Sequence, residues 1–216
     1  MATIKAYFSE IYPRRVKNVA MELCRDRDYF LIGRYKCANS GKSADLWIPD
    51  YLPTRGKSRV KPITSRFHAT IVKSTDPYGK EAYCLLDHSI NGTFELTSKS
   101  AGTGLETRPI GNCMETLPLQ RFRKDPEAVR ATKAIMREFE HDSIMPQERT
   151  SQKVKNLLEF EPNAFSDFEA FACVFAMLRS KSRRSDLLSS AWTLADGVQI
   201  GVPTYAGMLR IVFSMR

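Results

Sequence analysis

Short runs of apolar or alternating apolar and polar residues dominate the first 96 positions. Turn-forming sequences such as "TDPYGK" (75–80) and "HSINGT" (88–93) separate them. Short strands at this spacing predict a β-sandwich or barrel. The expected strands are "IKAYFSEI" (4–11), "VAMELC" (19–24), "YFLIGR" (29–34), "ADLWI" (44–48), "FHATIVK" (67–73) and "EAYCLLD" (81–87).

Residues 123–190 change to a helical period. Asp125 before Pro126 predicts a helix start, and a second segment opens at Pro146. A third begins at Ser166, which forms a capping-box pattern with Glu169. Its apolar stripe is interpreted as helix core, with a partner-binding groove or a cofactor site as the alternatives. The stripe consists of Phe168, Phe171, Ala172, Phe175 and Leu178.

Strand patterns return at the end of the chain. "WTLADGVQIGV" (192–202) and "MLRIVFSM" (208–215) read as strands, whereas 97–119 is rich in Gly, Ser, Thr and Pro and reads as a linker or long loop. The predicted class is therefore mainly β, a sandwich with an α-helical insertion. We expect residues 4–96 and 192–216 to form one discontinuous sandwich, and 97–191 to be linker and helical insertion.

The charge of the chain is concentrated in one stretch. The formal net charge is +9, and from Gly33 to His68 there are eight basic residues against two acids. Such a cluster attracts phosphate, nucleic acid or acidic peptide, or it is a solvated loop. Single-stranded nucleic acid favours aromatic residues among the basic ones, and none lies between Arg55 and Arg66.

Cysteine usage and hydropathy indicate the compartment. The five cysteines form no CxxC pair, and their number is odd, which favours a reducing environment. The first residues show no apolar signal-peptide core, and no apolar run reaches the ~18 residues of a membrane span. We expect a soluble cytoplasmic or nuclear protein with no membrane contact.

Ser65 and His68 raise the question of a nucleophile and its base. On a strand, residues three apart point to opposite faces, so the two side chains would not meet. No G-x-S-x-G elbow surrounds Ser65. The sequence therefore predicts no catalytic residue here, and no enzyme.

Metal and nucleotide sites are also not expected. Cys84 and His88 could join His68 as ligands, but the spacing matches no common zinc pattern. "ANSGKS" ends like a P-loop, yet Lys36 stands where that motif needs glycine. We expect neither a metal nor a cofactor.

Three short motifs occur in a specific order. Gly33-Arg34 ends one apolar run, Ser65-Arg66 precedes His68-Ala69, and Asn91-Gly92-Thr93 follows another run. This ordered set resembles the forkhead-associated (FHA) domain family. That family binds phosphothreonine peptides through loops at one end of a β-sandwich. The resemblance covers roughly residues 4–96 and 192–216.

The resemblance implies a role for each motif residue. Arg34 would bond the phosphate or the peptide backbone, Ser65 would offer its hydroxyl to a phosphate oxygen, and Asn91 would bond the peptide main chain. His68 would hold the Ser65 loop, Gly33 ends the strand before Arg34, and Gly92 and Thr93 would form the turn that presents Asn91. Arg66 belongs to the same motif and is counted among the phosphopeptide-binding residues.

The chain departs from the family pattern in two places. The spacer "YLPTRGKSRVKP" (51–62) is long and basic, and Lys57 or Arg59 could complete a phosphate site. The family's closing strand pair is matched only about a hundred residues downstream, by "LADGVQIGV".

The sequence thus predicts a phosphothreonine-peptide-binding module that acts as a signalling or assembly adaptor. Its partner would be a phosphothreonine-containing protein, with self-association through the helices as a further option. Two alternatives stay open. One is nucleic-acid binding through the basic cluster 34–66, and the other is a degenerate FHA fold that binds an unphosphorylated partner.

Overall fold

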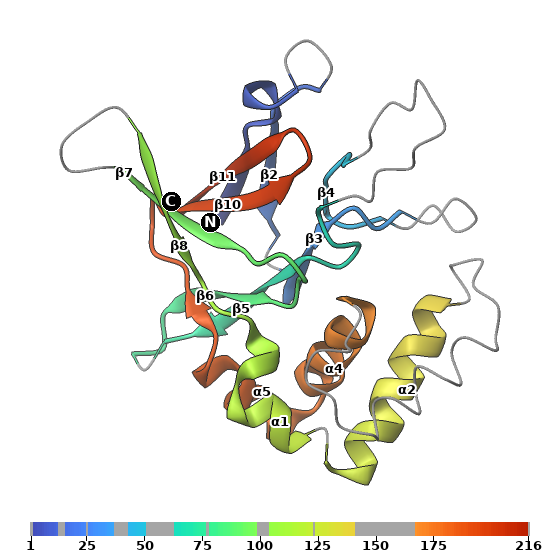
Figure 1. The fold of residues 1–216 in the computed structure, drawn as a ribbon. Coiled ribbons are helices and arrows are strands. Elements are labelled where there is room, and N and C mark those ends of the chain that lie inside the picture. The colour runs from blue at the N-terminus through green and yellow to red at the C-terminus, as the bar shows by residue number, and fades with distance from the viewer. Residues whose placement is uncertain are drawn as a thin grey trace, which may run out of the picture.

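The chain folds into two β-sheets and a layer of helices (Figure 1). This computed structural model describes residues 2–12, 16–24, 26–36, 43–50, 63–76, 78–98, 104–122, 124–140 and 167–215. The six-stranded sheet runs in the order β2 (Val19–Leu23), β1 (Ala2–Ala6), β11 (Gly207–Met215), β10 (Gln199–Thr204), β7 (Phe94–Ser98), β8 (Leu105–Pro109). The five-stranded sheet runs in the order β4 (Leu46–Trp47), β3 (Tyr29–Gly33), β5 (Ala69–Thr75), β6 (Glu81–Asp87), β9 (Trp192–Thr193). The predicted class, mainly β with additional helices, is confirmed.

One hydrophobic core lies between the two sheets. Along β11, Leu209, Ile211 and Phe213 are fully buried while their neighbours are more exposed, which is the period-2 pattern of a strand with one covered face. Ile32 and Ile71 of the second sheet belong to the same core cluster. The alternation that predicted strands from the sequence therefore reflects this shared interior.

The two ends of the chain meet in one sheet. β1 lies between β2 and β11, with Ile4 opposite Met21 on one side and Phe213 on the other. β10 joins β11 to β7, and β9 pairs with β6 of the other sheet. The C-terminal strands thus share both sheets with the N-terminal strands, and the termini lie close together (Figure 1).

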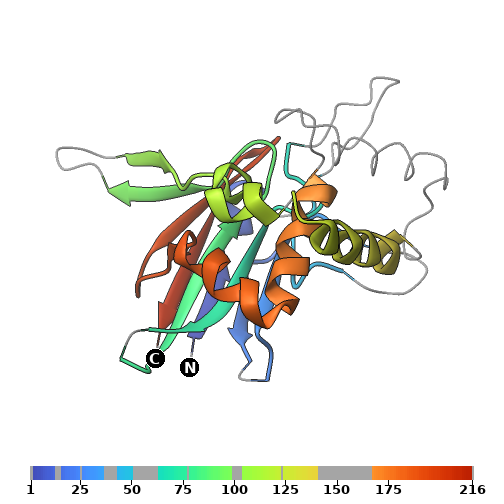
Figure 2. The ribbon, with the colours of Figure 1, turned by 90° about the horizontal axis from the view of Figure 1, so that it is seen from below.

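Helices cover the outer face of the five-stranded sheet, as the view from below shows (Figure 2). They are α1 (Leu117–Phe122), α2 (Pro126–Glu140), α4 (Asp167–Arg179) and α5 (Lys181–Ser189). The short 3-10 turn η2 (Cys113–Glu115) directly precedes α1, and a second one, η1 (Phe8–Glu10), follows β1. The Asp125 carboxylate accepts the N–H of Glu127 at 2.9 Å, as expected for an N-cap. The segment predicted from Pro146 and the capping residue Ser166 lie outside the described residues.

The predicted stripe of α4 is core. Phe171 and Phe175 are 1% exposed and pack with Val72 and Leu86 of the sheet and with α2. β3, β5 and β6 are therefore buried on both faces, which explains their continuous apolar runs. Within the part of the chain described here, no helix combines the length and apolarity needed to cross a membrane.

The linker expected at 97–119 contains regular structure. β8 pairs with β7 in antiparallel register, Phe94 opposite Pro109 and Ser98 opposite Leu105, and α1 begins at Leu117. All five residues of β8 are exposed. Because neither face of this edge strand packs on the core, its sequence shows no alternation of apolar and polar residues. Its polar composition therefore resembled that of a loop.

Candidate functional site

Three connections meet beside the ends of β3, β5 and β6: the residues after β3, the segment 63–68 before β5, and the β6–β7 turn 88–93. The N–H of Arg34 donates to the carbonyl of Ser65 at 3.3 Å. The Asn91 amide donates from Nδ2 to the carbonyl of Ile63 at 2.6 Å. The structure therefore brings Arg34, Ser65 and Asn91 together around one loop, 63–68.

Arg34 is half-buried, and its guanidinium is oriented by that loop. Nε donates to the carbonyl of Thr64 at 2.8 Å. Because guanidinium groups are planar, one such bond restricts the direction of the terminal nitrogens as well. Arg34 is thus held beside Ser65 through both its backbone and its side chain.

Ser65 is 5% exposed, and its hydroxyl has a defined acceptor role. The Oγ atom accepts the N–H of Ile90 at 3.1 Å. A hydroxyl can accept and donate at once, so this bond leaves its proton for a donor role. Ser65 therefore links the loop 63–68 to the turn that carries Asn91.

His68 is fully buried and supports the same loop. Its Nδ1 lies 3.4 Å from the N–H of Ser65 and accepts that bond, and its own N–H donates to the carbonyl of Ile32 at 2.9 Å. Burial, followed by the nearby His88, lowers the pKa of His68 to about 3. The ring is neutral at ordinary pH, and its bond to Ser65 is to the backbone and not to the hydroxyl.

Two glycines of the motifs have different reasons to be glycine. A Cβ on Gly33 would lie 2.3 Å from the carbonyl oxygen of Arg66, which is occupied by the N–H of Tyr35 at 2.9 Å. No side chain fits there. Gly92 has a φ of +79°, a left-handed conformation that glycine adopts without strain.

Sequence reasoning missed two aspartates that fix the loops. The carboxylate of Asp50 is 1% exposed, and it accepts the N–H groups of Ile63 (2.8 Å), Thr64 (2.6 Å) and Tyr205 (3.0 Å). It therefore joins the loop 63–68 to the β10–β11 turn. The sequence signal that could have indicated this role is an aspartate shortly after an apolar strand run, in "LWIPD" (46–50).

Asp87 does the same for the other turn. Its two oxygens accept the N–H groups of Ser89 and Thr93, each at 2.9 Å. Burial raises the pKa of this carboxyl, and the bonds from Ser89 and Thr93 counteract that rise. Thr93 is 1% exposed, so it belongs to the frame of the Asn91 turn and not to its surface.

The remaining predicted residues divide into two groups. Arg66 is half-buried, with its guanidinium 5.8 Å from the ring centroid of Tyr35 and 5.7 Å from that of Phe67. It covers an aromatic pair beside the loop. Lys57 and Arg59 lie outside the described residues.

Among the described residues, His68, His88 and Cys84 were the candidate metal ligands. Both ring nitrogens of His88 are in contact with protein atoms, Nδ1 with the carbonyl of Phe67 and Nε2 with the hydroxyl of Thr70, each at 2.9 Å. Across the described ranges, His, Cys, Asp and Glu form no group of three that could hold an ion.

Comparison with known proteins gives no relative: no family model, no curated protein and no solved structure matches the chain.

Proposed function

We propose that the protein binds phosphothreonine peptides through Arg34, Ser65 and Asn91 and acts as an adaptor in signalling or assembly. The observation that carries the proposal is that three separate connections bring these side chains together: Arg34 and Asn91 donate to the carbonyls of Thr64 and Ile63, and the Ser65 hydroxyl accepts the N–H of Ile90, next to Asn91. The forkhead-associated resemblance of the same residues supports it.

The chemistry of the three groups suits a phosphate. A phosphothreonine brings about −1.5 to −2 charges and three acceptor oxygens. An arginine fork, a serine hydroxyl and an asparagine amide are donors of the required kind, and Asn91 also offers an acceptor to a peptide N–H. Ser65 and Arg34 are held by hydrogen bonds before any ligand arrives, so little ordering remains to be done on binding.

Binding needs no chemical step in this proposal. His68 is neutral and buried, and it supports Ser65 through the backbone. Arg66 adds positive charge beside the loop, and Lys57 and Arg59 are proposed as further cationic contacts. A niche for the threonine methyl group would favour phosphothreonine over phosphoserine by about 0.8 kcal/mol.

The test is a degenerate phosphothreonine peptide library, followed by calorimetry with the best peptide, its phosphoserine form and its unphosphorylated twin. Arg34→Ala and Ser65→Ala should each weaken binding by roughly ten-fold to a hundred-fold, because hydrogen bonds to charged groups contribute roughly 1.5–3 kcal/mol each. Lys80→Ala is the matched control. Lys80 is exposed in the β5–β6 turn, after the last residue of β5, whereas the site lies after the last residue of β3 and before the first residue of β5.

Three results would contradict the proposal. Wild-type affinity in both variants, with unchanged melting temperatures, would remove Arg34 and Ser65 from the site. Equal affinity for the unphosphorylated twin would favour the degenerate fold. A duplex that binds with a steep loss of affinity between 50 and 200 mM salt, typical of several phosphate contacts, would favour nucleic acid.

A further inference from the structure

β8 (Leu105–Pro109) is the last strand at one end of the six-stranded sheet, beside β7. All five of its residues are exposed, and β7 and β8 project beyond the other strands (Figure 2). A strand in this position leaves backbone N–H and C=O groups along its outer edge, where another strand can pair with them. The sheet can therefore be extended at β8.

The hydrogen bonds to β7 show which groups of β8 face this outer edge. The N–H of Ile110 donates to the carbonyl of Thr93 at 3.0 Å, so these two residues form a hydrogen-bonded pair. Such pairs alternate with non-hydrogen-bonded pairs along antiparallel strands, so Arg108 and Glu106 also bond to β7. The remaining residues of β8, whose backbone groups point to the outer edge, are Leu105, Thr107 and Pro109.

The side chains of β8 are complementary to a second copy of β8 in one register. Two antiparallel copies with Thr107 opposite its own counterpart place Glu106 of each copy opposite Arg108 of the other. The outward N–H and C=O of Thr107 then form two hydrogen bonds between the copies. Opposite charges directly across a sheet attract and like charges repel. Pairing centred on Glu106 or Arg108 would place like charges opposite each other, so the charges select the register centred on Thr107.

The two charged side chains are available for these contacts. Within the described ranges, neither Glu106 nor Arg108 forms an ion pair. In the register of β7 and β8, Glu95 lies opposite Arg108. Between two copies, Arg108 would therefore lie in a row between two carboxylates, Glu95 of its own chain and Glu106 of the second copy.

The strands at the other sheet ends are less suited to pairing with themselves. β4 and β9 contain two residues each. β2 has five residues, but antiparallel pairing about its middle residue, Met21, places Glu22 opposite Ala20 and forms no charge pair. Length and charge together therefore favour β8.

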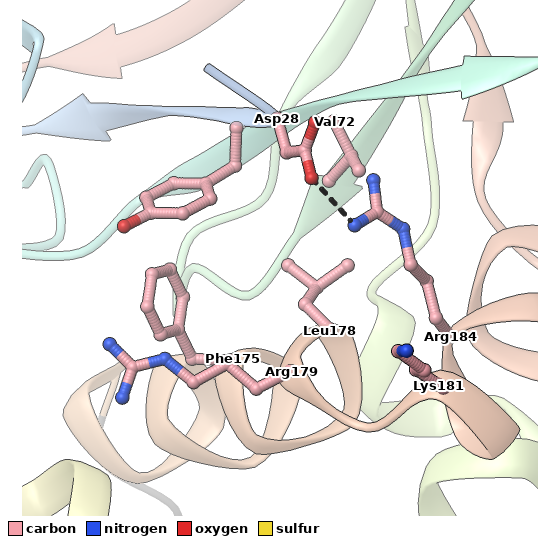
Figure 3. Close-up of a pocket in the computed structure, with 8 residues that line it drawn as sticks. Asp28, Val72, Phe175, Leu178, Arg179, Lys181 and Arg184 are labelled. Atoms are coloured by element: carbon pink, nitrogen blue, oxygen red, sulfur yellow. Dashed lines mark hydrogen bonds and ion pairs between the residues drawn. The ribbon is translucent and has the colours of Figure 1, made fainter. Parts of the chain in front are cut away.

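The cavity between α4, α5 and β5 offers no comparable surface (Figure 3). Its volume is about 300 Å³. The two arginines that line it already have partners: Arg184 lies 3.1 Å from the Asp28 carboxylate, and Arg179 lies 2.7 Å from that of Glu138. Their charges are thus compensated within the chain, in contrast to the edge of β8.

We propose that two copies of the chain pair through β8, antiparallel and centred on Thr107, so that their six-stranded sheets join edge to edge. The contact is the same on both copies, so it closes at a dimer. One five-residue strand from each copy buries less than the roughly 1,200 Å² of stable complexes, so the dissociation constant should lie between about 10 µM and 1 mM. The dimer does not depend on the proposed function, because β8 contains none of the candidate site residues.

Sedimentation velocity of the full chain, from about 10 µM to about 1 mM, tests the dimer. Salt at about 0.15 M screens the general repulsion between copies of net charge +9, and a reducing agent prevents a disulfide through the exposed Cys24. The sedimentation coefficient should rise with concentration to that of a dimer. Glu106→Arg and Arg108→Glu should each weaken the dimer at least about ten-fold, because either change makes both charge pairs repulsive. Glu22→Arg, the same substitution at an exposed position of β2, should dimerise like the wild type.

A mixture of the two variants tests the register. In a mixed pair, one copy carries arginine at both positions and the other carries glutamate at both, so both charge pairs are attractive again. The equimolar mixture should therefore sediment as a dimer at a concentration at which each variant alone is a monomer. This recovery also shows that both variants are folded.

NMR spectra report the backbone pairing without a substitution. The amide signals of Leu105 and Thr107 should shift as the concentration of the wild-type protein rises, while that of Glu22 in β2 should not.

A wild-type chain that stays monomeric up to about 1 mM would overturn the proposal. So would single variants that dimerise as strongly as the wild type, or a mixture that associates no more than its components. Species larger than a dimer would show an open-ended contact instead of the symmetric pairing of β8.

Discussion

Asp50 is the residue on which the shape of the candidate site depends most directly. Its buried carboxylate accepts three backbone N–H groups, two from the loop 63–68 and one from the β10–β11 turn. In Asp50→Asn one oxygen becomes an amide nitrogen, which cannot accept. The size of the side chain is unchanged, so the variant tests the hydrogen bonds and not the packing.

The magnitude follows from the three bonds. Hydrogen bonds to a charged group contribute roughly 1.5–3 kcal/mol, and neutral ones roughly 0.5–1.5 kcal/mol. With the amide nitrogen facing Tyr205, one bond is lost and the bonds from Ile63 and Thr64 become neutral. The lost bond removes roughly 1.5–3 kcal/mol and each neutralised bond roughly 1–1.5 kcal/mol, so the expected loss is roughly 3.5–6 kcal/mol in the free energy of unfolding, a large share of the stability of an ordinary domain.

Urea unfolding followed by circular dichroism measures this loss, and calorimetry measures phosphopeptide affinity in the same variant. Affinity should fall as well, because the loop 63–68 presents Ser65. Asp26→Asn is the control, since Asp26 is an exposed aspartate in the β2–β3 connection. If Asp50→Asn unfolds within about 0.5 kcal/mol of Asp26→Asn, the three bonds do not stabilise the loop as argued.

Two further predictions concern a glycine and a histidine. In Gly79→Ala the new Cβ meets no atom within 4 Å, but the backbone φ is +80°, so the free energy of unfolding should fall by about 1 kcal/mol. In Gly33→Ala the Cβ would lie 2.3 Å from the Arg66 carbonyl oxygen. This variant should lose clearly more stability in urea unfolding and should also bind phosphopeptide more weakly. Equal costs would contradict the steric reason. Burial lowers the pKa of His88 to about 4 from an ordinary 6.5, so as the pH falls this histidine is protonated in the unfolded chain first. The stability that neutral His88 contributes is complete above about pH 6.5. It declines by up to ~1.4 kcal/mol per pH unit down to about pH 4. His88→Gln should lose stability less steeply than the wild type, because buried His68, whose pKa is about 3, still contributes its own decline. If the stabilities of the two proteins fall in parallel between about pH 7 and pH 4, His88 does not titrate in this way.

The strands with one covered face were the most predictable part of this chain. β1, β10 and β11 alternate because one face meets the core and the other does not, and local sequence carries that information. β8 escaped prediction because neither face is covered. Its place is set by pairing with β7, a tertiary contact that leaves no period in the sequence.

The candidate site was predictable only where a residue type has a direct local consequence. Gly33 and Gly92 mark places where a side chain does not fit or the backbone is left-handed. Asp50 acts on residues 13 to 155 positions away, and its spacing from them follows no local rule. Hydrogen bonds of this kind, between residues far apart in the sequence, can be recognised only when the positions of the strands are known.

The packing of α4 against the loop 63–68 could not be predicted from local sequence either. Phe67 lies between Arg66 and His68 in the loop 63–68. Its ring stacks on that of Phe171 in α4, with 4.3 Å between the ring centroids, and on that of Tyr35, with 4.8 Å between the centroids. Its carbonyl is in contact with the ring of His88 at 2.9 Å. The loop that carries Ser65 is therefore stabilised in two ways: Phe67 packs on Phe171 of α4, and Asp50 accepts the backbone N–H groups of Ile63 and Thr64.

The helical segment is an insertion in sequence but part of the core in structure. Leu31, Val72, Leu86 and Phe67 are each at most 7% exposed, and all four belong to the cluster shared with α2 and α4. Exposing four such side chains costs roughly 6–12 kcal/mol at 1.5–3 kcal/mol each, which is similar to the whole stability of an ordinary domain. The two sheets therefore depend on the helices that cover the outer face of β3, β5 and β6.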